Sequence, residues 1–242
     1  MNGWICCLLL GQAAETPGIG ATQVGVVVHQ ERGQSRFRAT VLAKGDGTLI
    51  LLTAAHCLSP ADIGRDAQLL RGEEAVDAKV VRLSRNPSYR PPPAADAPGA
   101  DSAVATLEVS PKGEAERAVV AGMLPATAVA RPYPGPDGQT VLARMLDQKG
   151  AEHAVKAGNY SNPRWLEWGP VYKPIPGDSG SGVFVLGPGA DGKPAPRLIG
   201  NVVVRAENGG GAALVSTGTG WVAEALRPVA RKAQVDSAFK RD

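Results

Sequence analysis

The stretch PIPGDSGSGVFV, residues 174–185, sets a serine among glycines and an aspartate directly before an apolar run. Gly177 stands two residues before Ser179, and Gly180 follows it. A surface turn needs only one or two glycines, so three glycines and an acid around one serine need another reason. Glycines allow backbone N–H groups to point at a reacting oxygen. This interpretation requires a histidine and a second carboxylate elsewhere in the chain.

The composition favours an all-β protein. The 242 residues are 43% hydrophobic and 20% charged, as in an ordinary globular protein. Thirty glycines, 20 prolines and only 5% aromatic residues indicate many turns and short strands. The formal net charge of +3 is spread without a basic stripe or an aromatic platform, so no nucleic-acid partner is expected.

The apolar runs are short and bounded by turn residues. In the first half they are VGVVVHQ, FRATVLA, TLILLTAA, DAKVVRLS and SAVATLEV, and Asp46-Gly47 marks a hairpin between the second and third. Residues 86–101 predict a long surface loop, and the charged residues 110–117 a connector. The second half repeats this style through AVVAGMLPATAVA, QTVLARMLD, RWLEWG, SGVFVLG, RLIGNVVVR and AALVST. After Thr219 helix formers prevail, with a break expected at Pro228.

Three segments supply the chemistry that the serine needs. LLTAAHCL carries His56 at the end of an apolar run, ADSAVATLEV opens with Asp101, and GDSGSG carries Ser179. Alone, each has a plain structural interpretation: a core or edge histidine, a loop acid and a β-turn. Together, in the order His, Asp, Ser, they resemble the chymotrypsin-like (trypsin-like) serine proteases, of bacterial type.

The resemblance implies a serine endopeptidase that works through an acyl-enzyme intermediate. His56 is expected to act as general base and then acid, Asp101 to orient it, and Ser179 to attack the carbonyl carbon. The backbone N–H groups of Gly177 and Ser179 are expected to form the oxyanion hole. Ser181 replaces the second glycine of the usual GDSGG, a small-for-small change.

The resemblance also implies the architecture: two antiparallel Greek-key β-barrels with a C-terminal helix, and the cleft between the barrels. The expected divisions are a signal peptide over 1–14, a first barrel over 15–112, a connector over 113–118, a second barrel over 119–218, and a helix and tail over 219–242.

Substrate-binding residues follow from the same resemblance. Val203, Val204 and Arg205 are expected to offer a strand edge to an extended peptide. Lys173, six residues before Ser179, is expected at the floor of the specificity pocket. With Arg205 near its entrance, this pocket would favour an acidic side chain before the scissile bond; the alternative is that both cations simply face solvent.

The chain departs from the family in three ways. No activation cleavage block precedes TPGIGATQVG, so an internal Arg or Lys is expected to partner Asp178. Cys57 has no cysteine on the preceding strand to pair with, which predicts a free, buried thiol. The serine that supports the triad aspartate in the family would fall near Val203 and is missing.

Other features are read as structural. Trp165 and Trp168 are expected to be barrel aromatics rather than a binding shelf. The three histidines, His29, His56 and His153, show no metal-ligand spacing, so neither a metal nor an organic cofactor is expected, and His29 and His153 receive no role.

The remaining expectations concern location, partners and rival functions. The apolar run before residue 11 resembles a secretory signal but lacks a preceding cation and is too short to span a membrane. A secreted or periplasmic monomer that acts on protein or peptide is expected. The rivals are a pseudoprotease that binds proteins, and an esterase on the same scaffold. An α/β-hydrolase is excluded because every histidine precedes Ser179.

Overall fold

The computed structural model describes residues 18–31, 33–45, 47–91, 98–129, 140–158, 165–188, 193–206, 209–216 and 220–227. The expected signal peptide over 1–14 and the expected break at Pro228 lie outside these residues. Within the described chain, no helix is long and apolar enough to cross a membrane.

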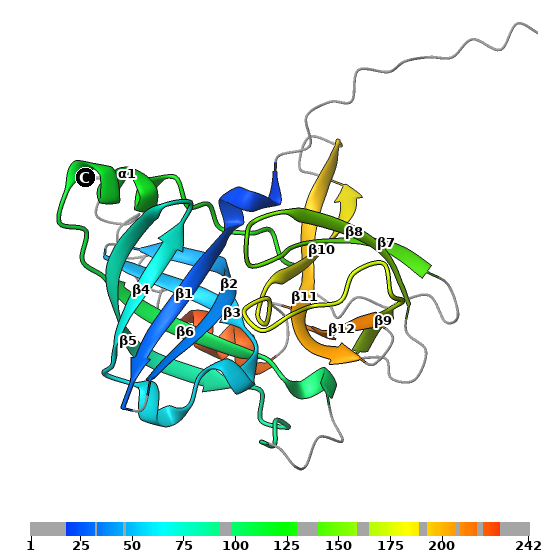
Figure 1. Cartoon of the computed structure of the whole chain (residues 1–242), viewed down its shortest axis with the longest axis horizontal. Coiled ribbons are helices and arrows are strands. Elements are labelled where there is room, and N and C mark those ends of the chain that lie inside the picture. The colour runs from blue at the N-terminus through cyan, green and yellow to red at the C-terminus, as the bar shows by residue number, and fades with distance from the viewer. Residues whose placement is uncertain are drawn as a thin grey trace, which may run out of the picture.

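The first barrel closes in the order β1-β2-β3-β6-β5-β4, with every pairing antiparallel (Figure 1). Its core is mainly aliphatic, filled by inward side chains of all six strands, and Phe37 is its one aromatic residue among those described. Its strands are β1 (Gln23–Gln30), β2 (Gly33–Gly45), β3 (Thr48–Thr53), β4 (Asp66–Arg71), β5 (Glu74–Arg85) and β6 (Ala103–Val109).

The second barrel closes in the order β10-β11-β12-β9-β8-β7. When its strands β7 to β12 are counted as first to sixth, each strand has the same neighbours as the corresponding strand of the first barrel. Its core adds aromatic rings to the aliphatic side chains. Its strands are β7 (Thr140–Leu146), β8 (Glu152–Gly158), β9 (Trp165–Trp168), β10 (Gly182–Pro188), β11 (Pro194–Ala206) and β12 (Gly209–Leu214).

The predicted fold class is confirmed: in each barrel the first three strands pair in sequence, and the fourth returns to lie beside the first, which is the Greek-key arrangement. The hairpin at Asp46-Gly47 is confirmed, since β2 and β3 pair across it. Two strands were not predicted, β4 and β8, because their sequences DAQLLR and EHAVKAG mix charged and small residues.

The chain between the barrels differs from the prediction. Residues 113–118 belong partly to a helix, α1 (Glu114–Ala121), and the apolar run after it forms no strand of either barrel. Ala128 makes an isolated parallel bridge to Leu198. Short 3-10 turns complete the described structure: η1 (Ile19–Thr22), η2 (Ala55–Cys57), η3 (Pro60–Asp62) and η4 (Pro98–Ala100).

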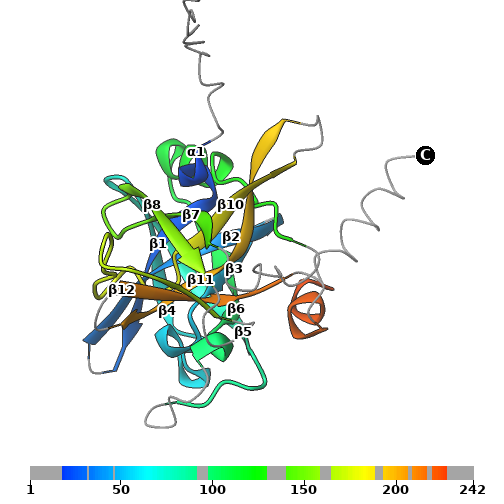
Figure 2. The same ribbon diagram turned by 90° about the vertical axis from the view of Figure 1, so that its right-hand side faces the viewer.

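A third apolar cluster joins the barrels. Ile50, Leu52 and Val104 from the first barrel pack in one cluster with Leu146, Phe184 and Leu198 from the second. The expected C-terminal helix is present over 220–227 and adds Val222 and Ala225 to this cluster. Figure 2 shows it in orange-red beside the barrels. The two barrels and the helix therefore share this third cluster, which lies beside the separate core of each barrel.

Candidate active site

His56 lies in η2, directly after β3 ends at Thr53. Its ring Nδ1 is 2.7 Å from Asp101 Oδ2, and its backbone N–H donates to Asp101 Oδ1 at 2.9 Å. The Asp101 carboxylate thus accepts hydrogen bonds from both the ring and the backbone of His56, and these two bonds fix the position of the imidazole. Asp101 is buried, whereas His56 keeps an exposed edge.

The pairing changes the acid strength of the imidazole. Burial alone would lower the pKa of His56, but the hydrogen bond to Asp101, followed by the influence of the neighbouring Cys57 and the negative charge of Asp101, raises it to about 10. A raised pKa means that the site stabilises the imidazolium form, which is the form that a general base reaches when it takes a proton.

Two side chains, Asn201 from the second barrel and Ser102 from the first, form a pair of hydrogen bonds that supports Asp101, and we call this pair the clamp. Asn201 on β11 donates from Nδ2 to the Asp101 carbonyl at 3.1 Å, and Ser102 Oγ donates to Asn201 Oδ1 at 2.7 Å. Ser102 and Asn201 are completely buried. Val203 occupies the place expected for the missing serine and packs with Trp165 and Ala213. Support for the aspartate therefore comes through its backbone rather than its carboxylate.

Two glycines give the Ser179 turn its shape. Gly177 has φ +102° and Gly180 has φ +85°, conformations that side-chain-bearing residues rarely adopt. A Cβ on Gly180 would lie 2.1 Å from both the Arg38 carbonyl oxygen and Thr53 Oγ1. The turn therefore presses its backbone directly onto β2 and the end of β3.

The backbone amides of the turn fall into two sets. Those of Asp178, Gly180 and Ser181 donate to carbonyl oxygens at 2.8–3.0 Å. Those of Gly177 and Ser179, the two expected in the oxyanion hole, have no acceptor among the hydrogen bonds of the described residues. Two amides left unpaired on one turn can bind an oxyanion.

Backbone and side-chain hydrogen bonds bring the three candidate residues to one junction between the barrels. Arg38 N donates to the Ser179 carbonyl at 2.9 Å, and Thr53, three residues before His56, donates to the Arg38 carbonyl at 2.9 Å. Gly180 N donates to Val202, the neighbour of Asn201. Within the described chain the Ser179 hydroxyl makes no hydrogen bond to His56. Such bonds are often long in free enzymes and tighten when substrate binds.

Asp178 is completely buried, and its partners differ from the prediction. Its carboxylate accepts from Tyr172 Oη at 2.7 Å, Ile175 N at 2.8 Å and Gln148 N at 2.6 Å. The ion pairs of the described residues do not include Asp178, so the expectation of a direct Arg or Lys partner is wrong there. Three donors satisfy the carboxylate without a cation in contact.

A cation nevertheless acts on Asp178 through space. Burial lowers the pKa of Arg38, and the charges of Asp147 and Asp178 partly restore it. Asp147 accepts from His153 Nε2 at 3.0 Å, and the His153 ring stacks on Tyr172 with centroids 4.1 Å apart. Burial raises the pKa of Tyr172, and so does its bond to Asp178. His153, expected to have no role, therefore supports the wall of the Ser179 turn.

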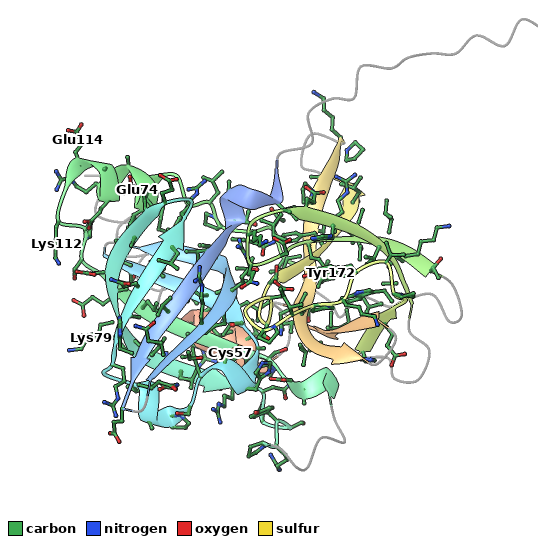
Figure 3. The ribbon with its side chains drawn as sticks, in the orientation of Figure 1. Cys57, Glu74, Lys79, Lys112, Glu114 and Tyr172 are labelled. Carbon is green, nitrogen blue, oxygen red and sulfur yellow. The ribbon has the colours of Figure 1, made fainter. Side chains whose placement is uncertain are left out.

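Ser181, which stands where the family usually has a glycine, contacts both barrels through its hydroxyl. Its hydroxyl lies 2.7 Å from Gln23 Oε1 on β1 and 2.6 Å from the Leu146 carbonyl on β7. One O–H therefore bridges the two barrels immediately after the candidate nucleophile. Cys57 and Tyr172, labelled in Figure 3, mark the first-barrel and second-barrel sides of this region.

The structure also describes the remaining residues that the sequence singled out. Cys57 is a free, buried thiol, as predicted. Trp165 and Trp168 are each 5% exposed, so both are buried as predicted; Trp168 packs in the core of the second barrel, and Trp165 packs with Val203 and Ala213. Lys173 is exposed, and Val204 and Arg205 belong to β11. The substrate-binding role of these residues stays a prediction.

Several site residues were missed by the sequence analysis. Asn201 is the one polar residue within LIGNVVV, a signal that could have been used. Tyr172, Arg38 and Gln23 carry no such signal, because their contacts depend on how the barrels meet. Among the described residues, no group of three or more His, Cys, Asp or Glu side chains is arranged to hold a metal ion.

Comparison with known proteins rests on structure. No family model matches the chain, and no curated protein matches it by sequence. A thermostable serine protease from an extremophilic microorganism matches with a TM-score of 0.57 and 17% identity, over 86% of this chain and 98% of that one. An inactivated protease paralogue of the scabies mite matches with a TM-score of 0.59 and 13% identity, over 87% and 96%.

The protease Anisep from Arthrobacter nicotinovorans matches with a TM-score of 0.53 and 11% identity, over 82% of this chain and 92% of that one. These neighbours are chymotrypsin-like serine proteases, active or inactivated. The chain therefore has the chymotrypsin-like serine protease fold.

Proposed function

We propose that this protein is a serine endopeptidase that uses Ser179, His56 and Asp101. The observation that carries the proposal is the His56–Asp101 pair, with Nδ1 to Oδ2 at 2.7 Å and the backbone N–H of His56 on the second oxygen. A histidine that only packs does not need both oxygens of a buried carboxylate. A histidine that takes up a proton during a reaction does.

The reaction follows from these groups. His56 accepts the Ser179 proton as Oγ attacks the peptide carbonyl carbon, and Asp101 stabilises the imidazolium that results. The unpaired amides of Gly177 and Ser179 receive the oxyanion. His56 then protonates the leaving amine, the acyl-enzyme forms, and water releases the acid by the reverse sequence of proton transfers.

The edge of β11 is the candidate binding site for the acyl half of the substrate. β10 pairs with β11 as far as Gly182 and Asn201, and the backbone of Val202 bonds to the Ser179 turn. From residue 203 onward, the edge of β11 that pairs with β10 earlier in the strand has no strand partner in the described chain, while the opposite edge continues to pair with β12. An extended peptide could add there along Val203, Val204 and Arg205, with Lys173 in the adjoining pocket.

A second candidate is a protein-binding module without catalytic activity. The missing Ser179–His56 hydrogen bond favours it, and one structural neighbour is an inactivated paralogue. An esterase on the same scaffold would share the acyl-enzyme chemistry and differs only in its substrate.

Labelling with a fluorophosphonate probe tests the proposal. Wild type should be modified at Ser179, located by mass spectrometry, and Ser179→Ala and His56→Ala should both abolish modification. Ser88→Ala, on the exposed 86–91 segment, is the matched control. Folded wild type that resists the probe would support the binding module. Parallel panels of peptides and esters then separate an endopeptidase from an esterase.

A further inference from the structure

A pocket of about 260 Å³ opens between the barrels beside the Ser179 turn. The first barrel contributes β1, β2 and the turn between β4 and β5, where Glu74 is labelled in Figure 3. The second barrel contributes the turn after β7 and Gly177 itself. The proposed mechanism uses only Gly177 from these walls.

Two buried polar side chains, Gln23 and Arg38, line this pocket, and each has one side-chain nitrogen without a hydrogen-bond partner. Gln23 is 2% exposed, and its Oε1 accepts from Ser181 and from the Gly182 amide, so its Nε2 must face the other way. Arg38 is 8% exposed. Neither Gln23 Nε2 nor Arg38 Nε has a hydrogen-bond partner, although both residues line the pocket. Both nitrogens have almost no solvent-exposed surface, so an acceptor that enters the pocket meets the charge of Arg38 through the wall and not through these N–H groups.

The charge of the walls favours an anion as that acceptor. Four cationic residues line the pocket against two acidic ones, Glu73 and Glu74. Arg36 and Lys149 are exposed at the rim. Arg71 is directed toward the Val119 carbonyl, 3.5 Å from its Nη1. Arg36 and Lys149 are therefore the cations that an incoming group meets first, and Arg38 lies behind them.

The pocket lies on the leaving-group side of Ser179. The acyl half of a substrate would run along β11 from residue 203, whereas the described walls of the pocket come mainly from β1, β2, the turn between β4 and β5, the turn after β7 and Gly177. Arg38 N holds the Ser179 carbonyl, so β2 passes next to the nucleophile. Arg36 is two residues away along β2, about 7 Å at the rise of a strand. A peptide extended beside β2 would bring its second residue after the scissile bond to Arg36.

We propose that this pocket binds the leaving half of a peptide substrate and selects an aspartate or glutamate at the second residue after the scissile bond. Arg36 and Lys149 attract the carboxylate, and the buried charge of Arg38 behind them adds to the positive potential of the pocket. The inference rests on the proposed endopeptidase function and gives it a substrate class.

Matched peptides that differ only at that second residue test the selection. With the full chain, kcat/KM should be about tenfold higher for Glu than for Gln, as expected for hydrogen bonds to a charged group. The double variant Arg36→Gln/Lys149→Gln should bring the ratio close to one. Arg82→Gln, an exposed cation on β5 outside the pocket, should keep it. Equal cleavage by wild type, or a ratio that survives the double variant, overturns the inference.

A binding measurement separates this inference from the proposed function. Ser179→Ala removes the nucleophile, and calorimetry then compares the affinities of short amidated peptides that mimic the leaving half, with Glu or Gln at the second position. Tighter binding of the Glu peptide, lost in Arg36→Gln/Lys149→Gln, supports the pocket even if wild type resists the fluorophosphonate probe. Labelled, active wild type with equal affinities refutes the pocket and leaves the proposed function standing.

Discussion

Two buried carboxylates flank the Ser179 region, one from each barrel, and their partners differ. Asp101 faces a titratable imidazole with an exposed edge. Asp178 faces a phenol and two backbone amides and is completely buried. Both carboxylates have hydrogen-bond partners, but only Asp101 has a partner whose charge changes at a pH of about 10 or below.

The difference teaches how the same side chain serves two tasks. A carboxylate that supports proton transfer needs a partner whose charge changes during the reaction. A carboxylate that fixes a turn needs donors that stay as they are, and the raised pKa of Tyr172 keeps its O–H protonated. Substitutions at the two sites should therefore have different signatures, one in rate and pH dependence and the other in stability.

The largest effect is expected from Asp101→Asn. The amide keeps the shape of the site but favours the wrong imidazole tautomer, so the rate of fluorophosphonate labelling should fall by about 10⁴-fold. The folded state should persist by circular dichroism. Asp66→Asn, exposed on β4, is the control and should label normally. A loss below about tenfold would mean that Asp101 does not act through His56.

The pH dependence of His56 is the second test. With its pKa raised to about 10 from the ordinary 6.5, His56 is protonated at neutral pH, and labelling should rise with pH toward that value. The stability from this pair should be fully present below pH 6.5 and be lost as the pH rises toward 10. NMR titration of the imidazole measures the pKa, which should drop in Asp101→Asn. An unchanged pKa would contradict the assigned cause.

Tyr172→Phe probes the other carboxylate. Removal of the hydroxyl leaves a buried acceptor short of one charge-assisted bond, so the free energy of unfolding should fall by about 1.5–3 kcal/mol. Urea denaturation measures this fall, and the imidazole pKa of His56 should not change. Tyr89→Phe, whose ring stacks under Arg85, is the control. A change in the pKa of His56 would show that the two carboxylate sites are coupled.

The smallest effect is expected at the clamp behind Asp101. Ser102→Ala and Asn201→Ala each remove one partner of a buried hydrogen bond. A double-mutant cycle in urea should give a coupling energy of about 1 kcal/mol. Because the clamp acts on the Asp101 backbone, the labelling rate should fall much less than in Asp101→Asn. Additive single effects would mean that the clamp contributes no specific support.

Much of the fold could be predicted from local patterns. Turn residues such as Asp46-Gly47 separate apolar runs, and the three blocks around His56, Asp101 and Ser179 resemble one family in the right order. The strands β4 and β8 were not predicted, because a barrel strand needs only its inward residues to be apolar, as Leu69 and Val155 are in these two strands. The helix α1 was not predicted, because its charged sequence is equally typical of a connector between two domains.

Less of the site could be predicted, because its supports join residues far apart in the chain. Asp178 was expected to need a cation, yet Tyr172 and two amides satisfy it, and amides carry no signature in a sequence. Asn201 supports Asp101 from a hundred residues away. The unpaired N–H groups of Gln23 and Arg38 likewise arise only where the two barrels meet.

The helix over 220–227 has a consequence for the order of events during synthesis. Its Val222 and Ala225 belong to the cluster that covers Ile50 and Leu52 of β3, the strand that leads into His56. A ribosome makes β3 long before it makes this helix. Until the helix emerges, Ile50 and Leu52 lack this part of their apolar cover. The strand that positions His56 is therefore fully packed only after nearly the whole described chain has been made.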